Sequence, residues 1–172
     1  FDEVMTGFRV SMGGAQEIYE IDPDLTTLGK VIGGGMPMGA VTGKKEIMEY
    51  LAPIGPVYQA GTLSGNPVAV AAGIATLTIV TKKDFFPKLT KITSEFTREL
   101  EKIAKENNIR SFCCDSVGGM FGIYFRQTIP KTFEDIMDSD VNFFKIFFNN
   151  MLANGVYLAP SPYEAGFLSV SH

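Results

Sequence analysis

Apolar residues recur along the chain at regular intervals, and these intervals indicate which segments are helices. Spacings of three and four residues predict an amphipathic helix over residues 89–103 and a second helix, rich in phenylalanine, over residues 144–152. Asn66-Pro67 is typical of a helix start, with a capping side chain and a proline in the first turn. The helix predicted to follow, to about residue 80, is apolar on every side, so we expect it to be buried all round, either in a large core or between subunits.

Short apolar runs bounded by glycine, proline or asparagine predict strands. These runs cover residues 24–28, 40–42, 109–114, 120–125, 156–158 and 167–170, and a short helix is predicted over residues 44–51. Asn107-Asn108 would end the amphipathic helix and mark a change of pattern. We therefore predict an α/β chain in two parts, with residues 1–82 in a large α/β domain and residues 83–172 in a smaller α+β domain.

Composition and charge narrow the classes of function. The chain is 45% hydrophobic and 20% charged, which is typical of a globular protein, and its net charge of −4 does not favour nucleic acid or an anionic membrane as a partner. No apolar run reaches the roughly 18 residues that a membrane span requires. Cys113 and Cys114 are adjacent, which suits neither a metal site nor a redox pair, and so few cysteines favour a reducing, cytoplasmic compartment. A small-molecule partner fits these properties best.

Lys30 is the only charged residue between Thr26 and Val41, and it lies between the strand predicted at 24–28 and the glycines at 33–35. If it were buried there, desolvation would lower its pKa from about 10.4, and the neutral amine could condense with an aldehyde. A shift of about three pKa units corresponds to roughly 4 kcal/mol. The spacing alone favours a different interpretation, a lysine whose ammonium group reaches the surface.

Asp2 and Glu3 begin the chain with a pair of carboxylates. Ligands of open α/β sheets bind outside the carboxyl ends of the strands, and Asp2 and Lys30 are both expected there. Asp2 could then keep a pyridine nitrogen protonated, as cofactor enzymes require. It could equally cap a turn, or form with Glu3 a magnesium site of a nucleotide hydrolase. No complete Walker loop is found, because GAVTGKK at residues 39–45 has the wrong spacing and ending.

Gly61 and Thr62 precede the helix start at Asn66-Pro67. Their backbone N–H groups and the threonine hydroxyl could bind a phosphate, although turns of this composition are common.

Six segments in one order carry a more specific signal. They are DEVMTGFR at residues 2–9, PDLTTLGKVIGGGMPMGA at 23–40, GPVYQAGTLSGNP at 55–67, VGGMFGIYF at 117–125, GVYLAPSPYEAGF at 155–167 and SVSH at 169–172. Together they resemble the glutamate-1-semialdehyde 2,1-aminomutases, a group of the class-III pyridoxal-phosphate aminotransferase family. The resemblance extends over nearly the whole chain and implies a fragment from the C-terminal half of that sequence.

The resemblance implies an aspartate-aminotransferase-like fold and a homodimer with each active site at the subunit interface. It also implies pyridoxal 5'-phosphate as the cofactor, with pyridoxamine 5'-phosphate as its amine form in the cycle. By motif position, Lys30 would hold the cofactor as a Schiff base and move protons. Asp2 would bond the pyridine nitrogen, and Val4 would pack against the ring.

The same resemblance implies roles for residues later in the chain. Gly61 and Thr62, with Tyr58 close by, would bind the phosphate of the neighbouring subunit's cofactor. Glu164 would line the substrate site, although a solvated loop carboxylate explains this residue nearly as well. No metal site is implied.

The implied reaction is the isomerisation of glutamate-1-semialdehyde to 5-aminolevulinate by transfer of the amino group, a step of tetrapyrrole (porphyrin) biosynthesis. Two alternatives stay open. One is a class-III ω-amino acid or 4-aminobutyrate aminotransferase, which shares the lysine, the aspartate and the Gly-Thr phosphate site. The other is the nucleotide-hydrolase fragment with Asp2-Glu3 as its magnesium site. The sequence does not decide whether these residues are active by themselves.

Overall fold

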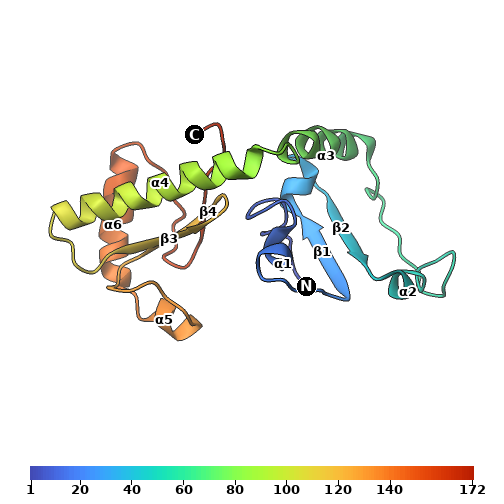
Figure 1. The fold of residues 1–172 in the computed structure, drawn as a ribbon, viewed down its shortest axis with the longest axis horizontal. Helices are drawn as coiled ribbons and strands as arrows, with labels where there is room; N and C mark the ends of the chain where they lie inside the picture. Colours follow the sequence, from blue (N-terminus) through green and yellow to red (C-terminus); the bar gives the residue numbers. More distant parts are fainter. The chain divides into compact units, whose positions relative to one another are not determined.

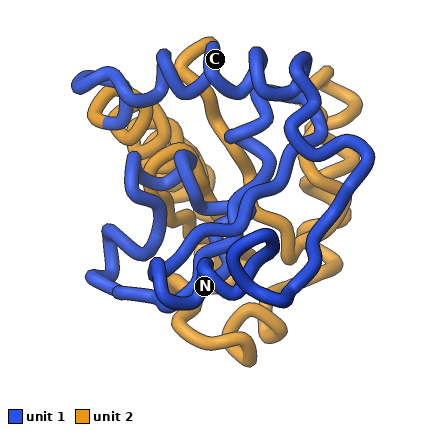
Figure 2. Tube along the Cα trace, turned by 90° about the vertical axis from the view of Figure 1, so that its right-hand side faces the viewer, with its two compact units in different colours: residues 1–86 blue, residues 87–172 orange.

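The computed structural model describes all residues from Phe1 to His172 (Figure 1). The chain divides into two compact units, Phe1–Phe86 and Pro87–His172, which Figure 2 distinguishes by colour. The division lies in the first turn of a long helix, α4 (Phe85–Glu106). No helix is both long enough and apolar enough to cross a membrane.

Unit 1 is built on an antiparallel hairpin of β1 (Leu25–Gly29) and β2 (Gly39–Gly43), seen side by side in Figure 1. The register places Leu25 opposite Gly43 and Gly29 opposite Gly39. A single 3-10 turn, η1 (Lys30–Gly33), follows β1 directly. Two short helices complete the first half of the unit, α1 (Gly14–Ile18) before β1 and α2 (Lys45–Met48) after β2.

The last helix of unit 1, α3 (Pro67–Val80), packs against η1. It begins as predicted, because the Asn66 side chain accepts hydrogen bonds from the backbone N–H groups at the helix start. Close approach depends on Gly73, where an added Cβ would lie 2.3 Å from the Ile32 carbonyl oxygen. Residues of this chain alone do not cover the helix on every side, since Val68 is 63% and Ile74 61% exposed.

Unit 2 contains a three-stranded antiparallel sheet in the order β3 (Cys113–Val117), β4 (Met120–Tyr124), β5 (Gly166–Phe167). In Figure 1, α4 runs along this sheet, and its Phe96 ring packs edge-on against Phe121 at a centroid distance of 5.0 Å. This side of the sheet is therefore part of the core of unit 2.

Two more helices, α5 (Phe133–Met137) and α6 (Val141–Ala153), complete unit 2. Phe125 lies at the centre of the aromatic core, with ring contacts to Phe112, Phe143, Phe144 and Phe147. The predicted phenylalanine stripe is thus a packing surface.

Several predicted elements differ from the structure. The helix expected over residues 44–51 forms only from Lys45 to Met48, and the strand expected over residues 109–114 lies instead at Cys113–Val117. Residues 156–158 form no strand, and only Gly166–Phe167 pairs near the end of the chain. Residues 109–112, 156–158 and 169–170 are not paired with a neighbouring strand, so they lack the ladder hydrogen bonds of a sheet.

Candidate functional site

Lys30 directly follows the last residue of β1 and begins η1. Its backbone has a φ of 49°, a left-handed conformation that costs a non-glycine residue roughly 1–3 kcal/mol. The two residues Ile32 and Gly33 that follow in η1 are buried and hold this turn in place. The side chain of Lys30 is exposed and forms no ion pair. Residues of this chain alone therefore do not bury the Lys30 amine.

Asp2 lies beside β1, because the first residues of the chain run parallel to this strand. Asp2 forms a parallel bridge with Thr27, whose N–H donates to the Phe1 carbonyl at 2.9 Å. One carboxylate oxygen of Asp2, Oδ1, accepts the Val4 N–H at 2.8 Å and faces the Thr27 hydroxyl at 3.5 Å. The other oxygen accepts no hydrogen bond, so it is free to receive one from a ligand.

Val4 packs against the end of the same strand. A Cβ added to Gly29 would lie 3.1 Å from Val4 Cγ1, so the absence of a side chain at Gly29 allows this close approach. Asp2 lies beside Thr27, in the middle of β1. Val4 packs at the carboxyl end of the strand, against Gly29, and Lys30 follows directly. Backbone pairing of residues more than twenty positions apart thus places the start of the chain along β1.

Glu3 points to the opposite side of its strand from Asp2 and is fully buried, at 0% exposure. Its carboxylate accepts hydrogen bonds from the N–H groups of Ala15 at 3.0 Å and Gln16 at 2.7 Å, and from the Thr6 hydroxyl. These contacts contradict the predicted magnesium site at Asp2-Glu3, because both Glu3 oxygens already have protein donors. No cluster of three potential metal ligands exists in the chain.

Tyr58, Gly61 and Thr62 lie in the loop between α2 and α3 and are all exposed. A turn forms where the Ser64 N–H donates to the Gly61 carbonyl at 2.9 Å. The loop, the start of β2 and the start of α3 enclose a hollow of about 340 Å³ that Gly61 lines. No hydrogen bond joins these three residues to Lys30, Asp2 or Val4.

Glu164 lies in unit 2, in the loop before β5. Its side chain is exposed, and its backbone N–H donates to the Ser161 carbonyl at 3.4 Å. The residue lines a small hollow with Phe121, Phe144 and Phe147. The structure gives it no charged partner.

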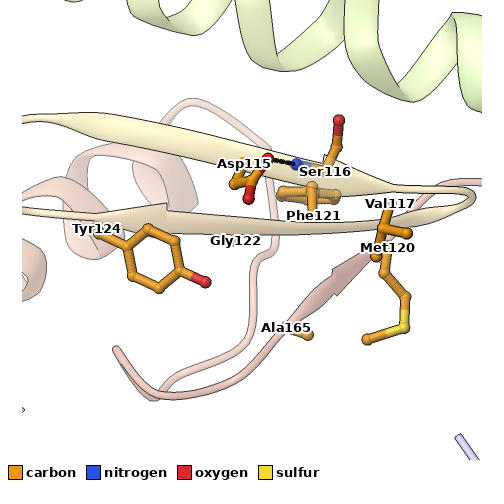
Figure 3. A pocket seen from close by; sticks show the side chains of 8 residues that line it. All are labelled: Asp115, Ser116, Val117, Met120, Phe121, Gly122, Tyr124 and Ala165. Carbon is orange, nitrogen blue, oxygen red and sulfur yellow. Dashed lines mark hydrogen bonds between the residues drawn. The ribbon is translucent and has the colours of Figure 1, made fainter. Parts of the chain in front are cut away.

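A further hollow of about 130 Å³ lies on unit 2, and no sequence pattern predicted it (Figure 3). Tyr124 lies over Gly122, where an added Cβ would meet the tyrosine hydroxyl at 2.1 Å. Burial, followed by the nearby Asp115 carboxylate, raises the pKa of Tyr124. Asp115 accepts the N–H of the adjacent Ser116 at 2.8 Å, the bond drawn as a dashed line. These groups form no catalytic pair.

Comparison with known proteins identifies the family. Residues 1–164 match the family described as Aminotransferase class-III. The chain belongs to this family. Among curated relatives, the chain is 59% identical over 172 residues to a glutamate-1-semialdehyde 2,1-aminomutase of Polynucleobacter necessarius subsp. necessarius, covering 100% of the chain and 40% of the relative. It is 57% identical, with the same coverage, to the enzyme of that name from Nitrosospira multiformis.

Solved structures share the fold. An ω-transaminase from Sphaerobacter thermophilus aligns with a TM-score of 0.84 at 27% identity, over 100% of this class-III chain and 39% of that one. A glutamate-1-semialdehyde aminomutase from Pseudomonas aeruginosa, in complex with PMP, aligns with a TM-score of 0.83 at 18% identity, over 100% and 40%. The predicted fold class, part of a pyridoxal-phosphate-dependent transferase of the aspartate-aminotransferase type, is confirmed. The chain spans about 40% of the length of its relatives.

Proposed function

We propose that the chain is part of a glutamate-1-semialdehyde 2,1-aminomutase, an isomerase that forms 5-aminolevulinate for porphyrin biosynthesis. The observation that carries this proposal is the match to curated aminomutases, which reaches 59% identity and extends over the entire chain. Four curated relatives that are 56–59% identical to the chain over nearly all of its length carry this same name. The aminomutase is therefore preferred over an ω-amino acid or 4-aminobutyrate aminotransferase.

The end of β1 fits pyridoxal 5'-phosphate. Lys30 offers an amine without an ion-pair partner, and Asp2 offers a carboxylate with one oxygen free. Val4 offers an apolar surface between them, against Gly29. When bound, the cofactor supplies an electron sink for a substrate carbanion.

Each of these residues then has a defined task. Lys30 binds the cofactor covalently and, when released, moves protons to and from the reacting carbons as a general acid and base. The free Oδ2 of Asp2 holds a proton at the pyridine nitrogen, while Oδ1 stays fixed by the Val4 N–H. Val4 orients the ring from one face.

The phosphate and the substrate are assigned to other parts of the chain. Gly61 and Thr62, with Tyr58 close by, bind the phosphate of the cofactor in the second subunit of a homodimer. The exposed turn at Gly61 supports this, because its groups are not used by this chain's own lysine site. Glu164 lines the substrate site. Unit 1 corresponds to part of the large cofactor domain and unit 2 to the smaller domain.

The surroundings of the enzyme complete the proposal. We assign it to the cytoplasm, because both cysteines are unpaired thiols. No nucleic acid or membrane partner is part of the proposal, and its substrate is the small molecule glutamate-1-semialdehyde.

The proposal is tested in a complete enzyme by replacing the matching 40% of the Polynucleobacter necessarius aminomutase with this chain. The chimera should bind pyridoxal phosphate with a visible absorbance band and convert glutamate-1-semialdehyde to 5-aminolevulinate. Amination of an added keto acid without 5-aminolevulinate would identify an ω-amino acid aminotransferase instead. Absence of the visible band would reject a cofactor site at Lys30.

A further inference from the structure

We propose that Glu3 is the positioning residue that holds Asp2 in place beside β1. This inference rests on the proposed function, in which Asp2 keeps the pyridine nitrogen of the cofactor protonated. Glu3 itself touches neither substrate nor cofactor, since its side chain is fully buried. Its effect must therefore pass through the short segment that it shares with Asp2.

The buried carboxylate is a cross-link between two segments. Its oxygens accept the N–H groups of Ala15 and Gln16 and the hydroxyl of Thr6, which joins the first residues of the chain to α1. A buried carboxylate without such donors would be unstable, so these three bonds are what allows Glu3 to stay inside. Gly14 completes the fit, since an added Cβ there would meet the carboxylate at 2.6 Å.

The same residue is tied to β1 by its backbone. The Glu3 N–H donates to the Thr27 carbonyl at 2.9 Å, and the Glu3 carbonyl accepts the Gly7 N–H at 2.8 Å. Successive side chains of an extended segment point to opposite sides, so anchoring Glu3 inward turns Asp2 outward. The side-chain contacts of Asp2 itself are few, the Val4 N–H at 2.8 Å and the distant Thr27 hydroxyl. The backbone of Asp2 is also tied to β1 through Phe1, whose carbonyl accepts the Thr27 N–H, but Glu3 is the neighbour whose side chain fixes which way the segment faces.

The first arm of the test needs no cofactor. Glu3→Gln in the full chain keeps the shape but turns one acceptor into a donor that faces backbone N–H groups. Hydrogen exchange at the amides of Glu3, Val4 and Thr27 should accelerate about tenfold or more, as expected for loss of hydrogen bonds to a buried charge. The matched control is Glu17→Gln, because Glu17 lies on α1, the helix that Glu3 contacts, but is exposed and accepts the backbone N–H of Gly13 at 2.9 Å. It should leave those three amides unchanged.

A second variant tests the same proposal independently, in case Glu3→Gln does not fold. Gly14→Ala displaces the carboxylate without removing it, and it should accelerate the same amides. Gly155→Ala is its control, since Gly155 has a similar φ of 84° and nothing within 4 Å of an added Cβ. If Glu3→Gln and Gly14→Ala both fold and leave the Val4 and Thr27 amides as protected as in the wild type, the proposal is overturned.

The second arm reads the protonation that Asp2 is proposed to maintain. Pyridoxal phosphate with a nitrogen label in the ring is bound to the chain and followed by NMR over a pH series. The ring nitrogen should lose its proton at a lower pH in Glu3→Gln than in Glu17→Gln, in the same direction as in Asp2→Asn. An unchanged profile in Glu3→Gln would overturn the positioning role. If the wild-type chain binds no pyridoxal phosphate, the proposed cofactor site fails, and the exchange arm still decides the role of Glu3.

Discussion

The two strands of the unit 1 hairpin end in the same dipeptide, Gly-Lys, but the two lysines have opposite surroundings. Lys44, after β2, bonds the Asp24 carboxylate at 2.7 Å and lies 3.8 Å from Asp22, and the Asp24 hydrogen bond raises its pKa. Lys30, after β1, has no acidic partner and a left-handed backbone. A carboxylate partner favours the ammonium form of a lysine, and only Lys44 has such a partner. Identical local sequence is therefore placed in different electrostatic surroundings.

The largest effect should separate the two lysines directly. Lys30→Ala should abolish the visible band of covalently bound pyridoxal phosphate, because Lys30 is the residue proposed to form the covalent bond. Lys44→Ala should keep the band, since Lys44 is engaged with Asp24. Absorbance and peptide mass after borohydride reduction measure both. A band retained in Lys30→Ala and lost in Lys44→Ala would reverse the comparison.

Unfolding at alkaline pH compares a buried titratable group of unit 2, the Cys114 thiol, with the exposed lysines of unit 1. Cys114 is 5% exposed, and burial raises its thiol pKa to about 12. An unfolded thiol ionises near about pH 8.5, so the folded state is favoured fully below this value. Stability of unit 2 should fall as the pH rises from about 8.5 towards about 12. Denaturant unfolding over this range should show the loss in the wild type and less of it in Cys114→Ala.

Backbone strain at Lys30 predicts a smaller difference. Glycine accepts a φ of 49° freely, so Lys30→Gly should be more stable than Lys30→Ala by about 1 kcal/mol. Lys44 has a φ of −59°, and there the order should disappear or reverse, with Lys44→Gly no more stable than Lys44→Ala. Chemical denaturation of the four variants measures both differences. Equal stabilities at position 30 would mean that its backbone relaxes without cost.

The smallest effect is expected from the exposed Lys44–Asp24 pair. Its hydrogen bond lowers the pKa of Asp24, so that contribution is present above about pH 3.9 and is lost as the pH falls through the lower folded value. The pKa of Lys44 is raised, so its contribution is present below about pH 10.4 and is lost as the pH rises through the higher folded value. Between these limits, Lys44→Ala should lower the melting temperature slightly, and salt should remove the difference.

The sequence predicted those features that depend on local signals. The Asn66 cap defined the start of α3, and Lys30 directly follows β1, close to the strand end predicted from the apolar run. The role of Glu3 could not be found in this way, because its partners Ala15 and Gln16 are twelve and thirteen residues away. The missed helix α5 did carry a signal, the capping box of Thr132 and Asp135.

Burial was the other limit of the sequence. An apolar helix such as α3 predicts that something will cover it, but its pattern does not say which segment does so. Only Ala69, Gly73 and Val80 of this helix are buried within the chain. The same limit applies to Lys30, because its sequence pattern does not say which segment would cover it and its side chain is exposed in this chain.

The contact of Gly73 with Ile32 makes the position of Lys30 depend on two segments of the chain. Lys30 begins η1, and η1 packs against α3, a helix more than thirty residues later in the sequence. Translation would therefore deliver the reactive residue well before the part that fixes its location. A larger side chain at Gly73 would push η1 away from α3 and so move Lys30, without any substitution in η1 itself.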